Sequence, residues 1–515
     1  MYRGNPFGNP DGARADLKEV EHSFITDYPY GMSFERDLDG ILNKRVIVGA
    51  KGSGKTVYLR KIQSILKERV EINPSIYVDN NIEQNLNCTD RVIRFCELFP
   101  QRILSEKWNK AWQITIILTI ANKLLYNEKL KKYITISEKE ELVKLLRNSG
   151  LVTKEDIEQS REYSIYEHFQ ILLFNSETKV QINKILENRD LLYLKNKLTL
   201  ILRNAPEMYF FLDSIDLEYE HAPLHWLMCQ KGLYYAVLSF LQEDILGEKL
   251  HLIITLRDNV FTSILRSEHN TKFAAESHVF PLIWNYPNIK CFLSQKILSL
   301  DDCYFIVETI QQKTIQTWLS ISTINNEFEQ EETIEDFLIR HTRLVPRDVI
   351  IICNELAKLH AEVVLHHCKN ISDRIKEIVL KNSRVYGSEL LTICAKNITA
   401  NIMPNGAGRY DYSEGFTANQ FYHESIYTKL IVLLSSVIRK FEFGKDTLAE
   451  LERKGTAIFG ENSYVLDVLW QNNVIGYIDN ETSCFYGQGF TNDILLSREK
   501  DHYILCSCVA LKIFN

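Results

Sequence analysis

The chain has 515 residues, of which 45% are hydrophobic, 11% aromatic and 25% charged. This composition is typical of a folded globular protein and excludes disordered, collagen-like and low-complexity architectures. The formal net charge of -7 argues against a protein that coats polyanions with its whole surface, and no apolar run of about 18 residues predicts a membrane span.

The first 22 residues are polar and rich in Gly and Pro, without the apolar stretch of a secretory signal peptide. Eleven cysteines are scattered along the chain with no CxxC pair, which favours reduced and mostly buried thiols. We therefore expect a cytoplasmic protein. At roughly 150 residues per domain the length predicts about three domains, preceded by a loose lead-in over residues 1–44.

Five apolar runs predict strands, and they lie at 45–48, 75–80, 208–216, 251–258 and 278–284. Helical patterns separate the runs, so crossover connections should join them into a parallel sheet with helices on both faces, an α/β fold. The stretch 89–200 is mostly helical and too long for one crossover, which predicts a helical insertion. The predicted core domain covers 45–285.

The rest of the chain predicts a lid and a C-terminal domain. Residues 286–380 have a helical pattern with no clear strand, whereas 381–515 mix helical and short β patterns. Within the latter, 463–490 has the order helix, strand, turn, strand, which resembles a winged helix. Residues 381–515 carry 13 Lys and Arg against 15 Asp and Glu, without the basic excess of a DNA-reading module. A structural or protein-contact role is therefore favoured over DNA binding.

The most specific motif is GAKGSGKT at 49–56, which matches G-x-x-x-x-G-K-[ST] at every position between a predicted strand and a predicted helix. Its glycines allow the backbone N–H groups to turn inward, and the helix N-terminus behind them favours a negative group. Lys55 can reach the β- and γ-phosphates, and the Thr56 hydroxyl can bind Mg²⁺. The motif predicts ATP and Mg²⁺ as ligands. The predicted phosphate-binding residues are Gly49, Ala50, Lys51, Gly52, Ser53, Gly54, Lys55 and Thr56.

A second motif is FFLDSID at 210–216, where an apolar strand runs into acids. Asp213 suits the metal-holding acid beside a phosphate loop, together with Thr56, and Asp216 is the best candidate to polarise a water molecule. Ser214 stands where many ATP hydrolases have a catalytic glutamate. This departure predicts slow hydrolysis and a nucleotide-dependent switch. The simpler alternative is a strand that ends in an Asp-rich turn.

Two arginines are candidates to sense the γ-phosphate. The run LHLIITLRD at 250–258 ends in Thr255 and Arg257, on a strand expected beside the one that carries Asp213. The run LVPRD at 344–348 puts Pro346 near the first turn of a helix, followed by Arg347. For both arginines a solvated Arg-Asp turn is an equally good interpretation. The candidate catalytic residues are Asp213, Asp216, Arg257 and Arg347.

Together, GAKGSGKT, FFLDSID, IITLRD and LVPRD resemble the additional-strand P-loop ATPases of the AAA+/STAND type, which include origin-recognition-like ATPases and stand-alone bacterial ATPases of defence and mobile islands. The resemblance covers about 20–375. It implies a nucleotide-binding domain, a helical lid and a C-terminal winged helix. The lack of a second catalytic domain favours an ATPase that regulates or loads a protein partner. The resemblance leaves a homo-oligomer and a role in phage defence open.

Three alternatives also stay open at this point. The first is a DNA-binding initiator or loader ATPase that uses the winged helix. The second is a phosphotransferase whose insertion holds an acceptor substrate. The third is a nucleotide-locked scaffold without turnover.

Overall fold

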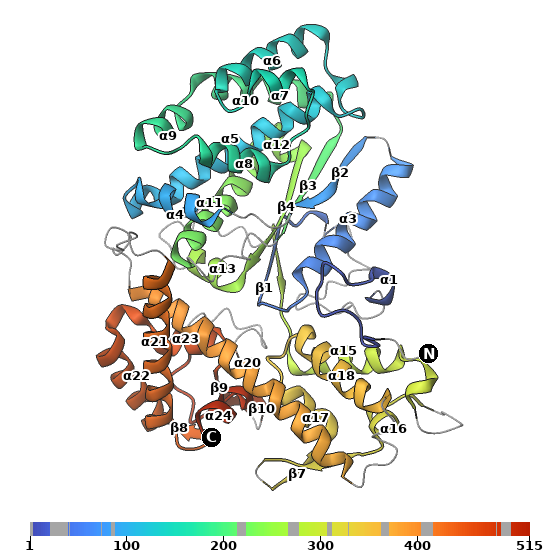
Figure 1. The fold of residues 1–515 in the computed structure, drawn as a ribbon, viewed down its shortest axis with the longest axis vertical. Helices are drawn as coiled ribbons and strands as arrows, with labels where there is room; N and C mark the ends of the chain where they lie inside the picture. Colours follow the sequence, from blue (N-terminus) through green and yellow to red (C-terminus); the bar gives the residue numbers. More distant parts are fainter. Residues whose placement is uncertain are drawn as a thin grey trace.

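The protein is described from a computed structural model, which defines residues 4–20, 40, 42–73, 75–83, 88–213, 223–265, 278–305, 312–327, 329–361, 370–402, 416–479, 482–485 and 496–514. It is a mixed α/β protein with a central sheet (Figure 1). The helices between β2 and β3, over residues 89–202, lie at one end of the molecule. The helices from residue 286 onward lie at the other end. None of the helices in these ranges has the length and apolarity needed to cross a membrane.

Five parallel strands form the central sheet, in the spatial order β2-β3-β4-β1-β5. Their bounds are β1 (Val46–Gly49), β2 (Ile76–Glu83), β3 (Glu207–Leu212), β4 (Leu250–Arg257) and β5 (Val279–Leu282). The buried apolar runs of β1, β3 and β4 are those of strands covered on both faces. The predicted α/β class and parallel sheet are confirmed. Since all strands point the same way, the residues that follow β1, β3 and β4 meet at one edge.

The two faces of the sheet have separate cores. Helix α3 (Lys55–Ile72) covers one face through Leu59 and Ile62, and α1 (Leu17–Val20) packs on α3. The other face shares a continuous core with the helices of residues 89–202 and with the helices that precede and follow β4. These helices are α4 (Thr89–Glu97), α5 (Gln101–Tyr126), α6 (Ile136–Ser149), α7 (Lys154–Glu158), α8 (Ile165–Phe174), α9 (Lys179–Leu186), α10 (Arg189–Leu202), α11 (Pro223–Leu241), α12 (Asp244–Lys249) and α13 (Asp258–Leu265).

Helix α5 lies at the centre of the inserted helices because its two tryptophans are buried against aromatic neighbours. The ring of Trp108 stacks on Phe95 with centroids 3.9 Å apart, and that of Trp112 stacks on Phe169 at 3.8 Å. The inserted helices are therefore joined to the sheet by one core and do not form an independent unit.

Buried histidine in the insertion makes stability depend on pH. His168 on α8 is fully buried, and its Nδ1 lies 2.9 Å from Oγ1 of Thr119. Burial lowers the pKa of His168 from 6.5 to about 4. Between pH 6.5 and about 4, His168 binds a proton in the unfolded chain but not in the folded chain. The free energy of unfolding is therefore at its full value above pH 6.5 and falls as the pH is lowered to about 4.

We expect His168→Gln to remove up to about 3 kcal/mol of the fall in unfolding free energy between pH 7 and pH 4. Urea unfolding at a series of pH values measures this dependence. His502→Gln is the control, since His502 is an exposed histidine outside the insertion. Parallel profiles for the wild type and His168→Gln would contradict the assignment.

The region after the sheet contains helices and one short hairpin. The helices are α15 (Tyr286–Leu298), α16 (Ile315–Leu319), α17 (Ile334–Arg340) and α18 (Pro346–Ala361). Strands β6 (Thr323–Asn325) and β7 (Glu331–Thr333) pair in antiparallel fashion, so the expectation of a region without strands is wrong. Among the residues of the two strands only Ile324 is buried, and an alternation this short leaves no pattern in the sequence.

The C-terminal part combines helices with a four-stranded antiparallel sheet in the order β10-β9-β11-β8. The predicted boundary at 380/381 falls inside the 32-residue helix α20, which packs on both α18 and α24 within one core. The elements are α20 (Ile371–Ile402), α21 (Phe416–Val437), β8 (Glu442–Gly444), α22 (Lys445–Phe459), α23 (Val465–Gln471), β9 (Ile475–Asp479), β10 (Thr482–Cys484), β11 (His502–Leu505) and α24 (Ser507–Ile513).

Candidate functional site

The GAKGSGKT segment forms a tight loop between β1 and α3. Gly52 and Gly54 have φ angles of +92° and +97°, a conformation that residues with a side chain rarely adopt. A Cβ atom on Gly49 would lie 2.5 Å from Oγ of Ser53, so this position also requires glycine. The glycines of the motif are therefore explained by the backbone path of the loop.

Lys55 spans the inner side of this loop from the first turn of α3. Its Nζ donates to the carbonyl oxygens of Gly49 at 2.8 Å and Ala50 at 3.0 Å. The loop is fixed from the other side, where Nε1 of Trp284 donates to the carbonyl of Ser53 at 2.8 Å. The first turn of α3 holds no acidic residue, so the lysine and the helix N-terminus together favour an anion here.

Asp213 lies at the same edge of the sheet, directly after β3. Its carboxylate is 1% exposed, and Oγ1 of Thr255 on β4 donates to its Oδ1 at 2.7 Å. The hydroxyl of Tyr166 on α8 donates to the Asp213 carbonyl at 3.1 Å. The side chain is thus oriented by the neighbouring strand, and its backbone is held by the insertion. Nothing in the sequence pattern indicated Tyr166, which is 47 residues away along the chain.

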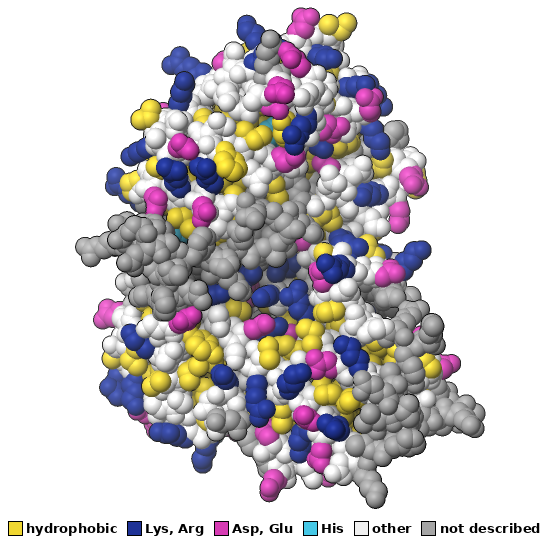
Figure 2. Space-filling view, viewed as in Figure 1, with side chains coloured by type: hydrophobic (Ala, Val, Ile, Leu, Met, Phe, Trp, Pro, Cys, Tyr) yellow, Lys and Arg dark blue, Asp and Glu magenta, His cyan; other side chains and the backbone are white. Residues whose placement is uncertain are grey.

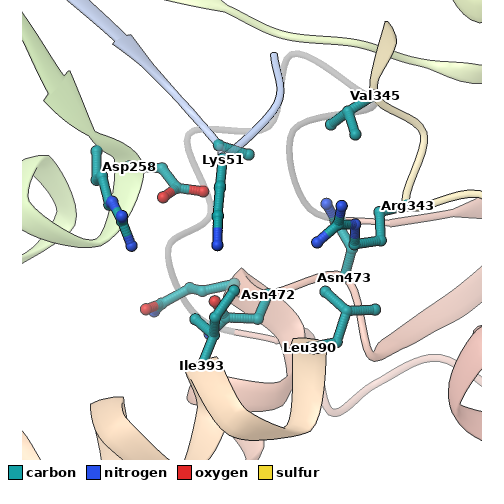
Figure 3. A pocket seen from close by; sticks show the side chains of 11 residues that line it. Lys51, Asp258, Arg343, Val345, Leu390, Ile393, Asn472 and Asn473 are labelled. Atoms are coloured by element: carbon teal, nitrogen blue, oxygen red, sulfur yellow. The ribbon is translucent and has the colours of Figure 1, made fainter. Parts of the chain in front are cut away.

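The end of β4 borders a pocket at this edge. Arg257 is paired in register with Gly49, which brings it beside the phosphate loop. Lys and Arg side chains gather in the hollow between the two halves of the molecule (Figure 2). In Figure 3 the side chain of Lys51 extends from the loop toward Asn472. The pocket is lined by Ala50, Lys51, Arg257, Asp258, Arg343, Val345, Leu390, Ile393, Gln471, Asn472 and Asn473.

Arg347 also lies against the loop, as the first turn of α18. Its backbone N–H donates to the Gly52 carbonyl at 3.4 Å, and its Nε donates to the carbonyl of Pro10 at 3.2 Å. The start of α18 is thus in direct contact with the phosphate loop. The guanidinium is engaged by the N-terminal lead-in, a contact that the sequence did not predict.

The lead-in is fixed at both ends over residues 7–15, although the sequence suggested a loose segment. Phe7 is 1% exposed, and the Asn354 side chain accepts from the Phe7 N–H at 3.0 Å and donates to the carbonyl of Gly8 at 2.9 Å. Arg60 on α3 donates to the carbonyls of Gly12 and Ala15 at 2.6 and 2.7 Å. This segment therefore connects α18 with the helix that follows the phosphate loop.

Thr56 is the residue of the phosphate loop that is predicted to bind the metal. Thr56 lies in the first turn of α3, and a Cβ on Gly12 would be 3.2 Å from its Cβ. Asp216 and Ser214 lie outside the described residues. Among the residues that are described, no group of three or more His, Cys, Asp and Glu side chains is arranged to hold a metal. Thr56 and Asp213 remain the candidate metal ligands.

Gly52 offers a test of the contact between the loop and α18. A Cβ atom there would be 3.1 Å from Cβ of Arg347 and 3.3 Å from Cγ2 of Val345. We expect Gly52→Ala to lower the free energy of unfolding by about 2 kcal/mol, from backbone strain and from this crowding. Gly150→Ala is the matched control, because Gly150 has φ +71° with nothing within 4 Å, and it should cost only about 1 kcal/mol. Urea unfolding measures both, and equal losses would contradict the contact.

The chain has a distant similarity to a known protein. No protein-family model matches the chain, and no solved structure is similar to it. The chain is 23% identical over 297 residues to a protein of Escherichia coli (strain K12) named as the 80.3 kDa protein of transposon gamma-delta. The match covers 56% of this chain and 38% of that protein, so the chain matches well under half the length of its relative.

Proposed function

We propose that the protein is an ATP-binding ATPase of the AAA+/STAND type that hydrolyses slowly and acts as a nucleotide-dependent switch on a partner protein. The observation that carries this proposal is the loop at 49–56, with its two left-handed glycines and with Lys55 across its inner side. Such a loop at a helix N-terminus provides the N–H groups and the cation that a triphosphate requires.

The residues present fit ATP and Mg²⁺. Lys55 and the backbone N–H groups of the loop would hold the phosphates, while Thr56 and Asp213 would hold the metal. The bound metal would neutralise charge on the transferred phosphoryl group. Asp213 suits this role because it is a buried carboxylate that Thr255 fixes from the neighbouring strand. Arg257 and Arg347 are proposed to sense the γ-phosphate, and Asp216 to polarise water.

The strand order supports the assignment to the additional-strand class. Strand β4 lies between β1, which precedes the phosphate loop, and β3, which precedes Asp213. The order α21, β8, α22, α23, β9, β10 in the C-terminal part supports a winged helix.

Three contacts are proposed to pass the state of the loop to the rest of the molecule. The start of α18 touches the loop through Arg347 and Gly52. The turn that contains Asn472 faces the loop across the pocket. Tyr166 links the insertion to Asp213. A change at the phosphates would therefore act on the lid, the C-terminal part and the insertion.

The burial of α23 favours a protein partner over DNA. In a DNA-reading winged helix or helix-turn-helix, the recognition helix exposes a face to the major groove. Here every residue from Val465 to Trp470 is buried, including Asp467. A DNA-binding initiator that used this helix would first have to expose it.

The proposal is tested by phosphate release and by hydrogen exchange of the purified protein. We expect Mg²⁺-dependent ATP hydrolysis below about one turnover per second, since Ser214 replaces the usual catalytic glutamate. We also expect exchange in α18 and at residues 471–473 to differ between ATP and ADP. Turnover of tens per second would contradict the slow switch. Identical exchange with both nucleotides would contradict switching itself.

A further inference from the structure

A groove runs beside the phosphate-loop pocket along one face of α20. It is open to solvent and is lined by Lys51, Arg384, Val385, Ser388, Glu389, Thr392, Ile393 and Lys512. The lining positions on α20 recur every three to four residues, so they form one stripe of the helix. Lys51 of the phosphate loop and Lys512 of α24 complete the lining.

The groove is positive although the chain is acidic. Lys51, Arg384 and Lys512 contribute three cations, and Glu389 is the only acid that the described part of the chain adds to the lining. Glu389 is itself paired with Arg343. Arg384 and Lys512 are exposed, and their side chains form no hydrogen bond or ion pair with any described residue. Two of the three cations are thus available to an anionic partner.

The same groove has an aliphatic part. Val385 is 52% exposed between Arg384 and Ser388, and Ile393 continues the apolar strip toward Lys51. No aromatic side chain is found among the described residues that line the groove. A ligand that fills it would therefore meet aliphatic surface flanked by cations.

We propose that this groove docks an acidic amphipathic segment of a partner protein, with Leu- or Ile-type side chains on Val385 and Ile393 and carboxylates on Arg384, Lys512 and Lys51. An amphipathic helix in a groove uses this combination of apolar anchors and flanking charge. Docking needs no nucleotide, so it does not depend on the proposed ATPase activity. Because Lys51 belongs to the phosphate loop as well, the docked segment would lie next to that loop.

Nucleic acid fits the groove less well. Proteins that bind duplex DNA tightly neutralise about 6–10 phosphates, whereas three cations are present here. Single strands usually stack on aromatic side chains, which this lining lacks. Neither ligand would explain the exposed Val385.

The test uses fluorescent peptides and the full-length protein without added nucleotide. The first probe is a helical peptide of about 14 residues with Glu and Leu along one face, and its matched forms carry Gln or Lys in place of Glu. A DNA duplex of about 20 base pairs is the fourth probe. The groove variant is Arg384→Glu with Lys512→Glu. The control variant is Lys429→Glu with Lys440→Glu, two exposed cations outside the groove lining.

We expect the wild type and the control variant to bind the Glu peptide at least about tenfold more tightly than the Gln peptide. The groove variant should lose that preference and favour the Lys peptide, with an unchanged melting temperature. The proposal is overturned if the wild type binds no peptide or does not distinguish Glu from Gln. It is also overturned if both double variants lose binding equally, or if the duplex is the tighter ligand and the groove variant abolishes its binding.

Discussion

Replacement of Lys55 by Ala is expected to weaken ATP binding about 100-fold, which corresponds to about 3 kcal/mol. The reason is that a charge-assisted contact between the ammonium group and the phosphates is lost. The fold itself should persist. Lys55 is half-buried, and its hydrogen bonds to the carbonyls of Gly49 and Ala50 lie at the surface of the loop rather than in the hydrophobic core.

Titration calorimetry with ATP and Mg²⁺ measures the loss directly. Lys67→Ala is the matched control, since Lys67 lies on the same helix, donates to the carbonyl of Asn80 and does not approach the loop. This control should bind ATP like the wild type. Wild-type affinity in Lys55→Ala would mean that the lysine does not hold phosphate.

Replacement of Asp213 by Asn is expected to lower ATP hydrolysis about 100-fold or more, while Mg²⁺-free ADP binding changes less than about threefold. The amide has the shape of the carboxylate, and its oxygen can still accept from Oγ1 of Thr255. The negative charge that would hold the metal disappears. Because Asp213 is 1% exposed, removal of this buried charge should leave the folded state at least as stable.

Phosphate release during a Mg²⁺ titration checks this prediction. Thr255→Val is the companion variant, since it keeps the carboxylate but removes the hydroxyl that orients it. It should reduce hydrolysis by only about tenfold and keep the dependence on Mg²⁺. The metal role of Asp213 would be ruled out if Asp213→Asn hydrolysed ATP at the wild-type rate.

The central sheet could be predicted from the sequence because each strand is a local apolar run. Strand β1, which ends at Gly49, and strand β3, which ends just before Asp213, are each apolar runs of six residues or fewer. Strands β6 and β7 have one buried residue between them, Ile324, and give no such pattern. Helix α20 is continuous through 380/381, where the change from a helical pattern to a mixed helical and β pattern suggested a boundary.

The candidate site also combines a local motif that the sequence shows with long-range contacts that it does not. The phosphate loop is a short contiguous motif, and its glycines, Lys55 and Thr56 could be identified without a structure. The contacts around it join distant segments, as in the hydrogen bond of Phe7 to Asn354 across 347 residues. A single sequence holds no periodic pattern for such a pair, so these contacts could not be predicted from it. The roles of Arg257 and Arg347 at the phosphates remain predictions.

The most direct test is a crystal structure of the wild type with Mg²⁺ and a non-hydrolysable ATP analogue. We predict that Nζ of Lys55 leaves the carbonyls of Gly49 and Ala50 and contacts the phosphates, with the metal between Thr56 and Asp213. The contrary result is a loop without the analogue at saturating concentration, in which Lys55 keeps both carbonyl contacts. That result would remove the basis for an ATP-dependent function.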